Sequence, residues 1–387
     1  MAINFEKDRC CGCLACMNIC PVGAIEKVKD ENGFIYPKVN KEKCIECHLC
    51  EKVCDFNSQN RKEKEIKDAY ALIHNNNKDI INSTSGGAFT ALSDIVLKKN
   101  GTVFGTIMDK DFNIYFTEAN DIENRNKMRG SKYSQSDPDL IYKKVKESLD
   151  SEKEVMFVGT PCQVGALKSF LQKDYGNLLA VEFLCHGVPN NDFLKAHIAY
   201  LENKYNKKAI NYTFRSKKYT WRAPGIEEIT FEGNKTKAGI DIQVYRDYFL
   251  KNMSLRESCY NCTYRKYTRV SDITIADFWG FDKIMGEKNF KGASLVLVNS
   301  EKGIKVINEL DVKEVKLTKV PFEKIKNNIS IHSIKSSVDT KEFWQTYKNL
   351  GYKGLVNKYS KNNIKEKAKF VVKKEVRKFI GKTLKNK

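Results

Sequence analysis

A doubled cysteine spacing near the N-terminus constrains the fold of this chain more than any other feature. Two runs of four cysteines share the pattern C-x2-C-x2-C-x3-C: Cys10, Cys13, Cys16 and Cys20, and then Cys44, Cys47, Cys50 and Cys54. A cubane iron–sulfur cluster needs four thiolates, and in such doubled runs three close cysteines wrap one cluster while the fourth ligates the other. The spacing therefore predicts two [4Fe–4S] clusters, one held by Cys10, Cys13, Cys16 and Cys54 and one by Cys44, Cys47, Cys50 and Cys20.

Zinc is the competing interpretation of these cysteines, because C-x-x-C pairs also suit tetrahedral zinc sites. Zinc does not require the doubled three-plus-one arrangement, so the pattern favours clusters. Residues 1–57 accordingly resemble a bacterial two-cluster ferredoxin in their spacing, and the polar residues 58–68 indicate a linker. Cys11 falls outside the pattern and is interpreted as a spectator.

Length and composition favour a folded, multi-domain chain. With 387 residues, of which 41% are apolar, two or three domains are expected. The N-terminus carries charges where a signal peptide needs an apolar core, and no apolar run reaches the length of a spanning helix, so a soluble, cytoplasmic protein is expected. In a reducing compartment, 13 cysteines with clustered spacing indicate metal or cluster ligands rather than disulfides.

The net charge of +20 is spread along the chain among Asn, Glu and Asp residues, which is typical of a solvated surface rather than of a nucleic-acid partner. Residues 361–387 differ, with 11 Lys or Arg against 2 Glu, a net of +9, and with apolar residues at helical spacing. Such a basic amphipathic tail is typical of peripheral contact with an anionic membrane or partner. A basic terminal helix without any target fits the same pattern.

Beyond Asp68 the sequence alternates between strand-like and helix-like segments. Apolar runs indicate strands at 69–74, 102–108, 113–119, 153–158 and 177–185, with further strands within 210–231 and 272–298. Helices are predicted to end at Gly101, to span 137–151, to begin at Pro161, and to cover 190–204 and 242–256. This order predicts an α+β or mixed α/β core with a partly parallel sheet, divided into residues 69–150, 151–310, a C-terminal extension at 311–355 and the tail at 356–387.

Two loops are candidates for holding a phosphate-bearing cofactor. In STSGGAF, hydroxyls and two glycines precede a helix, so main-chain N–H groups and the helix dipole can meet an anion. In MRGSKYSQS, charge, hydroxyl donors and one aromatic ring fall within nine residues, a mix that suits a pyrophosphate and a ring system. No G-x-G-x-x-G follows a strand, so a nicotinamide-binding Rossmann unit is not supported.

Four further cysteines lie outside the N-terminal pattern and the spectator. Cys162 follows Thr160 and Pro161 at a helix start, where the helix dipole is expected to lower the thiol pKa. Cys185 lies just past a strand's carboxyl end, where open α/β sheets place ligands, and Cys259 and Cys262 form a C-x-x-C pair. Spacing alone leaves two interpretations open. In the first, all four cysteines form a third metal site that holds an iron–sulfur cluster or zinc. In the second, Cys162 and Cys185 are buried thiols and the C-x-x-C pair is a separate redox or zinc site.

Several of these motifs, in the same order, are similar to the family of beta subunits of coenzyme F420 hydrogenases and dehydrogenases: SGGAFTAL, RGSKYSQS, GTPCQVGALKSFL, LCHGVP, and ESCYNCTYRK followed by SDITIADFWG. The resemblance covers roughly residues 1–300 and implies FAD beside a [4Fe–4S] cluster, often fused to a ferredoxin dicluster. It implies a third cluster held by Cys162, Cys185, Cys259 and Cys262. It also implies flavin contacts at Ser85, Gly86, Gly87, Arg129, Gly130, Ser131, Lys132 and Tyr133.

The function that follows from the resemblance is an iron–sulfur flavoprotein oxidoreductase. Electrons would pass between a small hydride donor or acceptor, such as reduced coenzyme F420, and a protein redox partner, through FAD and the clusters. Family members act on different substrates, so the resemblance sets the class of chemistry and leaves substrate and oligomeric state open. His186, beside Cys185, is a candidate for handling a proton, with a purely structural histidine as the alternative, and Asp277 and Trp279 are expected near the same site.

Two other functions compete with this one. A non-enzymatic electron-transfer subunit would carry the clusters in a larger complex without a flavin of its own. A zinc-bearing nucleic-acid binder would use the positive charge, but the sequence shows no recognition helix or aromatic stacking surface.

Overall fold

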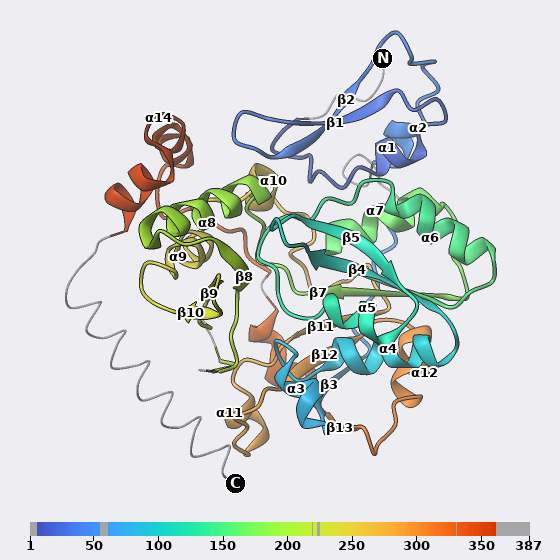
Figure 1. Ribbon diagram of the computed structural model, residues 1–387. Coiled ribbons are helices and arrows are strands. Elements are labelled where there is room, and N and C mark those ends of the chain that lie inside the picture. The colour runs from blue at the N-terminus through green and yellow to red at the C-terminus, as the bar shows by residue number, and fades with distance from the viewer. Residues whose placement is uncertain (1–5, 55–60, 219, 223–224, 330, 361–387) are drawn as a thin grey trace.

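The computed structural model describes residues 6–54, 61–218, 220–222, 225–329 and 331–360 (Figure 1). The predicted basic tail lies outside the described residues from 361 onward. None of the described helices combines the length and the apolar composition that crossing a membrane would require.

The largest sheet has eight strands: β3 (Asp68–His74), β4 (Thr102–Met108), β5 (Ile114–Ala119), β6 (Val155–Gly159), β7 (Leu178–Phe183), β11 (Ile273–Asp277), β12 (Ser294–Val298) and β13 (Val315–Lys319). Their order is β13-β3-β12-β11-β7-β6-β4-β5. The central pairs β4–β6, β6–β7 and β7–β11 are parallel, and the outer pairs are antiparallel. The predicted mixed, partly parallel sheet is therefore confirmed, and it unites sequence from residue 68 to residue 319.

Helices cover both faces of this sheet: α3 (Asn77–Ile81), α4 (Ala88–Lys98), α5 (Ile122–Lys127), α6 (Ile141–Asp150), α7 (Pro161–Leu171), α11 (Phe281–Met285), α12 (Glu301–Asn308) and α13 (Phe322–Ile325), with a 3-10 turn at Lys326–Asn328. Alternate residues of a strand point to opposite faces. Accordingly, Phe157 packs with the apolar residues of α6 and α7, whereas Met156 and Val158 pack with those of α4 and α12. Near-continuous apolar strands such as VMFVG are buried on both faces for this reason.

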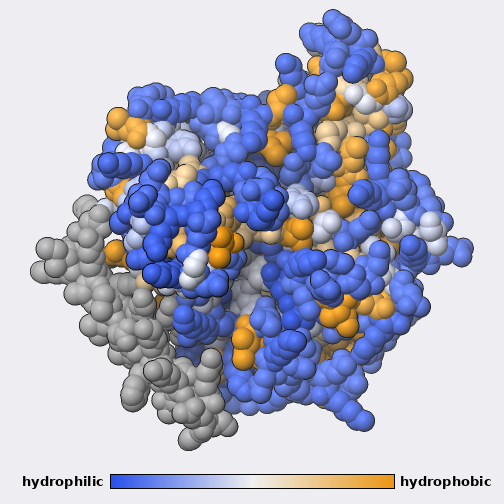
Figure 2. All heavy atoms as spheres, viewed as in Figure 1, coloured by the Kyte–Doolittle hydropathy of each residue, from blue (hydrophilic) through white to orange (hydrophobic). Residues whose placement is uncertain are grey.

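The N-terminal domain is small and lies against α6 and α7 at one end of the large sheet (Figure 1). It contains α1 (Ala15–Ile19), the antiparallel strands β1 (Ile25–Lys29) and β2 (Ile35–Val39), and α2 (Leu49–Lys52). Its own core is short and includes buried cysteines beside Leu14, Met17 and Ile25. Figure 2 shows hydrophilic residues over most of the visible face, with hydrophobic residues gathered at this domain, where Val22 and Ile45 are exposed.

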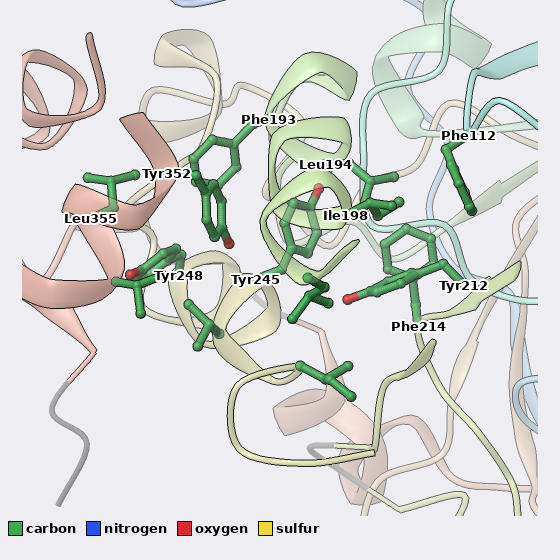
Figure 3. Packing of buried hydrophobic residues seen from close by; sticks show 14 of the residues in the cluster. Phe112, Phe193, Leu194, Ile198, Tyr212, Phe214, Tyr245, Tyr248, Tyr352 and Leu355 are labelled. Carbon is green, nitrogen blue, oxygen red and sulfur yellow. The ribbon is translucent and has the colours of Figure 1, made fainter. Parts of the chain in front are cut away.

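A third unit packs beside the sheet around an aromatic core. It contains α8 (Asn191–Tyr205), the antiparallel strands β8 (Ala209–Thr213), β9 (Glu228–Phe231) and β10 (Lys235–Lys237), and the helices α9 (Val244–Leu250), α10 (Glu257–Tyr260) and α14 (Thr340–Tyr359). Figure 3 shows Phe193 of α8 directed toward Tyr352 of α14, with Tyr245 and Tyr248 of α9 beside them. These rings are tilted against one another, with centroids 5.2–6.3 Å apart.

One predicted helix is shorter than expected. The sequence predicts a helix over 242–256, but α9 ends at Leu250. Asn252 adopts a left-handed conformation, with φ of 59°, and its side chain donates to the main-chain oxygen of Lys335. Asparagine tolerates this conformation better than most residues, so the chain turns there and redirects toward Cys259.

Candidate functional site

A cavity of about 300 Å³ opens at the carboxyl ends of the central parallel strands. Val158 of β6, Phe183 of β7 and Asp277 of β11 contribute to its wall. The two cofactor loops predicted from the sequence, at 83–89 and 128–136, form much of the rest, the second through its residues 128–133. Ligands of open α/β sheets bind at this edge, so the cavity lies where the topology favours a site.

The two loops meet because their residues bond to each other and to β12. Ser131 donates its main-chain N–H to Thr84 Oγ1 at 2.8 Å, and Gly86 donates its N–H to Ser294 Oγ at 2.9 Å. Gly86 has no room for a side chain, since a Cβ would lie 2.1 Å from the carbonyl oxygen of Leu72. Gly87 is the N-cap residue before α4 and has a φ of 94°, a left-handed conformation that favours glycine.

Seven of the eight predicted flavin contacts line this cavity: Ser85, Gly87, Arg129, Gly130, Ser131, Lys132 and Tyr133. Gly86, the eighth, lies beneath it against β3 and β12. The side chain of Arg129 pairs with Asp79 at 2.7 Å. Lys132 donates to the main-chain oxygens of Met128 and Arg129 at 3.0 and 3.1 Å, and burial lowers its pKa to about 8.

A buried ion pair forms one wall. Arg215 pairs with Asp277 and donates to the Tyr133 hydroxyl at 3.4 Å. Burial raises the pKa of Asp277, and the charge of Arg215 opposes that rise. At the mouth, Trp279 stacks parallel to Trp221 with centroids 6.2 Å apart.

Two cations of this site went unrecognised in the sequence. Arg215 and Lys217 follow β8, and Lys217 donates to the main-chain oxygens of Ile80 and Ser85, which fixes the loop before Gly86. Burial lowers the pKa of Lys217 to about 7. In a chain with 68 Lys and Arg residues, FRSKK carries no signal that distinguishes these two from solvated cations.

His186 lies apart from the cavity wall. Its Nε2 bonds to Asn252 Oδ1 at 2.7 Å, its ring packs edge-on against Phe249, and its carbonyl oxygen accepts from Arg265. Burial lowers the pKa of His186. These contacts are those of a structural histidine.

The four later cysteines come together from segments up to 100 residues apart. The pKa of Cys185 is raised by burial and then by the nearby Cys259, Cys162 and Cys262. Cys162 and Cys185 follow the same strands, β6 and β7, whose ends line the cavity. The four thiols are therefore neighbours, Cys162 and Cys262 pack against the same apolar cluster, and two of the four follow strands whose ends line the cavity.

The lowered pKa that the sequence predicts for Cys162 is wrong, because other contributions outweigh that of the helix start. Thr160 and Gln163 form a capping box at α7, and Thr160 Oγ1 lies 3.1 Å from Cys162 Sγ. Contact with Cys11 and burial nevertheless raise the pKa of Cys162 well above that of a free thiol. Removal from water and neighbouring thiols outweigh the helix dipole here.

Cys11, interpreted from the spacing as a spectator, lies at the junction of two cysteine groups. It neighbours both Cys13 and Cys162; contact with Cys13 and burial raise its pKa, and contact with Cys162 opposes that rise. Cys16 lies near Cys10, Cys54 and Cys50, and a small separate cavity is lined by Cys20, Cys44, Cys47 and Cys50. Within the described residues, no group of three or more His, Cys, Asp or Glu side chains is arranged to hold a single metal ion.

A cysteine-rich domain is set against an α/β sheet whose strand ends hold a polar cavity and more cysteines, an arrangement that suits an iron–sulfur protein. Comparison with known families makes this specific. Residues 152–325 match the C terminus of the coenzyme F420 hydrogenase/dehydrogenase beta subunit, and residues 9–58 match a 4Fe-4S dicluster domain. The chain carries the C-terminal domain of that family behind a 4Fe-4S dicluster domain, as the sequence predicts.

Individual relatives agree. One subunit of the F(420)H(2) dehydrogenase of Methanosarcina mazei is 25% identical over 175 residues, covering 42% of this chain and 49% of the relative. A coenzyme F420-dependent sulfite reductase from Methanocaldococcus jannaschii is 24% identical over 311 residues, covering 79% of this chain and 46% of the relative. The chain therefore spans about half the length of these two relatives.

A solved structure has a similar fold. The F420-reducing [NiFe] hydrogenase complex from Methanosarcina barkeri includes a chain that aligns with a TM-score of 0.50 at 15% identity, covering 74% of this chain and 94% of that one. This confirms the mixed α/β fold.

Proposed function

We propose that this protein is an iron–sulfur flavoprotein oxidoreductase that passes electrons between a small hydride donor or acceptor and a protein redox partner. The observation that carries the proposal is the position of the four later cysteines, which lie together beside a polar cavity at one sheet edge. A flavin and a cluster must be close for electrons to pass from one to the other. Strands β6 and β7 contribute to both places, which supports such a pairing.

The proposed cluster ligands are the twelve cysteines in three sets: Cys10, Cys13, Cys16 and Cys54; Cys20, Cys44, Cys47 and Cys50; and Cys162, Cys185, Cys259 and Cys262. Proximity supports each set. Cys10 and Cys54 lie near Cys16, and the second set lines one small cavity. The other three cysteines of the third set are close enough to Cys185 to raise its pKa. Cys16 neighbours Cys50 of the second set, and Cys11 neighbours both Cys13 and Cys162, which supports an order with the first set between the other two.

The proposed FAD site is the cavity beside the third set. Gly87 and the start of the 11-residue α4 present main-chain N–H groups, and Arg129 and Lys132 add positive charge, so an anionic pyrophosphate fits there. Bound FAD would supply hydride transfer in two-electron steps and release of electrons one at a time. Tyr133 and Trp279 offer aromatic surface, while the Arg215–Asp277 pair fixes the wall between them.

The substrate proposed first is reduced coenzyme F420, because two relatives carry that coenzyme in their names. A second candidate function is that of an electron-transfer subunit without its own flavin. One relative is named as a subunit of a dehydrogenase, which favours this second function.

Anaerobic purification with iron, sulfide and flavin quantified tests the proposal. About twelve iron atoms per chain are expected from three cubane clusters, together with about one flavin. Reduction assays with F420H2, NAD(P)H and reduced ferredoxin then identify the donor. Iron without any flavin would support the electron-transfer subunit instead, and zinc with little iron would contradict both functions.

A further inference from the structure

Arg256 is a fully buried arginine between the N-terminal domain and the α/β body, and the sequence motifs do not include it. Its side chain has 0% exposure. Its main-chain N–H donates to the carbonyl oxygen of Val188 at 2.9 Å, and its own carbonyl accepts from Cys259 N–H at 2.9 Å. The main chain of Arg256 is therefore fixed directly before the C-x-x-C pair.

The guanidinium of Arg256 extends from there into the N-terminal domain. Nε donates to the main-chain oxygen of Cys10 at 2.7 Å, and Nη1 donates to Ile35 O at 3.0 Å and to Gln135 Oε1 at 3.1 Å. Nη2 lies 3.8 Å from the sulfur of Cys10. The guanidinium also lies over the ring of Tyr36, 4.1 Å from its centroid. One side chain thus reaches a cysteine of the doubled motif.

Arg256 differs from the other buried arginines in its partners. Its hydrogen-bond acceptors among the described residues are two main-chain carbonyls, an amide oxygen and the Cys10 thiol. Three other buried arginines each pair with a carboxylate: Arg125 with Asp94, Arg215 with Asp277, and Arg269 with Glu182. A buried charge without an opposite charge is costly. A cysteine-ligated cluster at Cys10 is net negative and would supply the missing anion.

The same residues reach toward the second group of cysteines. Gln135, which accepts from Arg256, donates to the main-chain oxygen of Cys11 at 3.0 Å. Gly12 fits between them only because it lacks a side chain, since a Cβ would lie 2.9 Å from Arg256 Nη1. Arg256 also stands three residues before Cys259 of the third set, and its carbonyl accepts the N–H of that cysteine at 2.9 Å. One buried arginine is therefore fixed to both groups of cysteines.

We propose that Arg256 is the shared counter-cation of two iron–sulfur centres, the one that includes Cys10 and the one that includes Cys162, and that it raises the reduction potential of both. The proposal rests on the cluster ligands assigned under the proposed function. One-electron reduction adds a negative charge to a cluster, and a nearby fixed cation stabilises the reduced form. The set at Cys20, Cys44, Cys47 and Cys50 has no such contact among the described residues and serves as an internal reference.

Potentiometric titration with dithionite, followed by electron paramagnetic resonance, tests this on the intact holoprotein. In Arg256→Met, two of the three clusters should shift to lower midpoint potential by at least a tenfold change in equilibrium constant, about 59 mV for one electron. Gln135→Glu keeps Arg256 but places an anion against it, so both potentials should also fall. Arg256→Lys keeps the charge and should shift them less. Arg125→Met removes an equally buried arginine elsewhere and should leave all three unchanged.

Unchanged potentials in Gln135→Glu with full iron content would overturn the proposal, even if Arg256→Met failed to retain its clusters. A shift of all three clusters together would also overturn it, because the reference cluster should not respond. The iron content of the unmodified protein tests the third cluster separately. A chain with eight rather than twelve iron atoms would refute that cluster, while the effect of Arg256 on the Cys10 centre would remain measurable.

Discussion

At the scale of single residues, the glycines of the cavity floor show how closely the site depends on backbone contact. Gly86 and Gly130 lie on the two loops that meet there, yet they differ in their surroundings. A Cβ at Gly86 would clash with main-chain atoms of Leu72 and Ser294, whereas one at Gly130 would meet nothing within 4 Å. Gly130 needs glycine only for its φ of 83°. Lack of space therefore excludes a side chain at Gly86, whereas the left-handed backbone conformation disfavours one at Gly130.

Gly86→Ala should therefore destabilise the protein by about 3 kcal/mol, the upper part of the usual range for overpacking, and should reduce the flavin content on purification. Gly130→Ala is the matched control and should cost only about 1 kcal/mol, from left-handed strain. Thermal unfolding and flavin quantification of both variants measure this. Equal loss in the two variants would contradict the structural distinction.

The sequence predicted the residues of the site better than their electrostatics. The cysteine spacing and the two polar loops follow from local pattern, and the structure brings both loops into one cavity. Arg215, Lys217 and Arg256 could not be found that way, because their roles depend on contacts with residues 62 to 246 positions away. The pKa of Cys162 was misjudged for the same reason, since the local helix start was visible and the neighbouring Cys11 was not.

At the scale of secondary structure, the central strands of the large sheet were predictable because both faces are buried and their sequences are continuously apolar. The edge strand β13, VKLTK, is half exposed and was not predicted. The aromatic unit was harder, since α8, α9 and α14 are held by contacts over more than 100 residues. His197 of α8 lies in this unit with 0% exposure, and its ring packs near those of Tyr212, Tyr245 and Tyr352. A titratable ring is thereby enclosed by aromatic side chains.

Stability should fall at acidic pH because of this enclosure. Burial lowers the pKa of His197 to about 3, from an ordinary value of 6.5. Between these values the unfolded chain binds a proton that the folded chain does not, so stability is lost as pH falls below 6.5. From pH 6.5 to 5 the loss should be about 2 kcal/mol, at 1.36 kcal/mol per pH unit.

Urea unfolding at these two pH values, followed by tryptophan fluorescence, measures the effect. His197→Phe keeps an aromatic ring but removes the titrating group. Between pH 6.5 and 5, the variant should therefore lose about 2 kcal/mol less stability than the unmodified protein. An identical pH dependence in the variant and the unmodified protein would show that another group is responsible.

At the scale of the whole molecule, polar contacts of two kinds join the N-terminal domain to the body, in addition to the apolar packing of Ala15, Val53, Phe34 and Tyr36. Exposed ion pairs connect Lys27 to Asp137 and Lys29 to Asp192, each at 2.7 Å. Buried hydrogen bonds connect Arg256 and Gln135 to the main chain at Cys10 and Cys11. Exposed ion pairs contribute little to the free energy of domain attachment, because water and salt screen their charges. The buried contacts should therefore dominate the attachment of this domain.

Lys27→Ala combined with Lys29→Ala should lower the stability by less than about 1 kcal/mol per pair and leave cluster potentials unchanged. Denaturant titration and the same redox titration would show this. A large loss of stability, or a change in the potentials, would mean that the surface pairs rather than the buried contacts hold the domain in place.

The central claim is that a third cluster lies beside the flavin cavity, held by the four later cysteines. Iron content of Cys162→Ala against Cys11→Ala tests it most directly, because the two thiols are neighbours and only Cys162 is a proposed ligand. Cys162→Ala should lose about four iron atoms and keep about eight, while Cys11→Ala should keep about twelve. Equal iron content in the two variants would contradict the account.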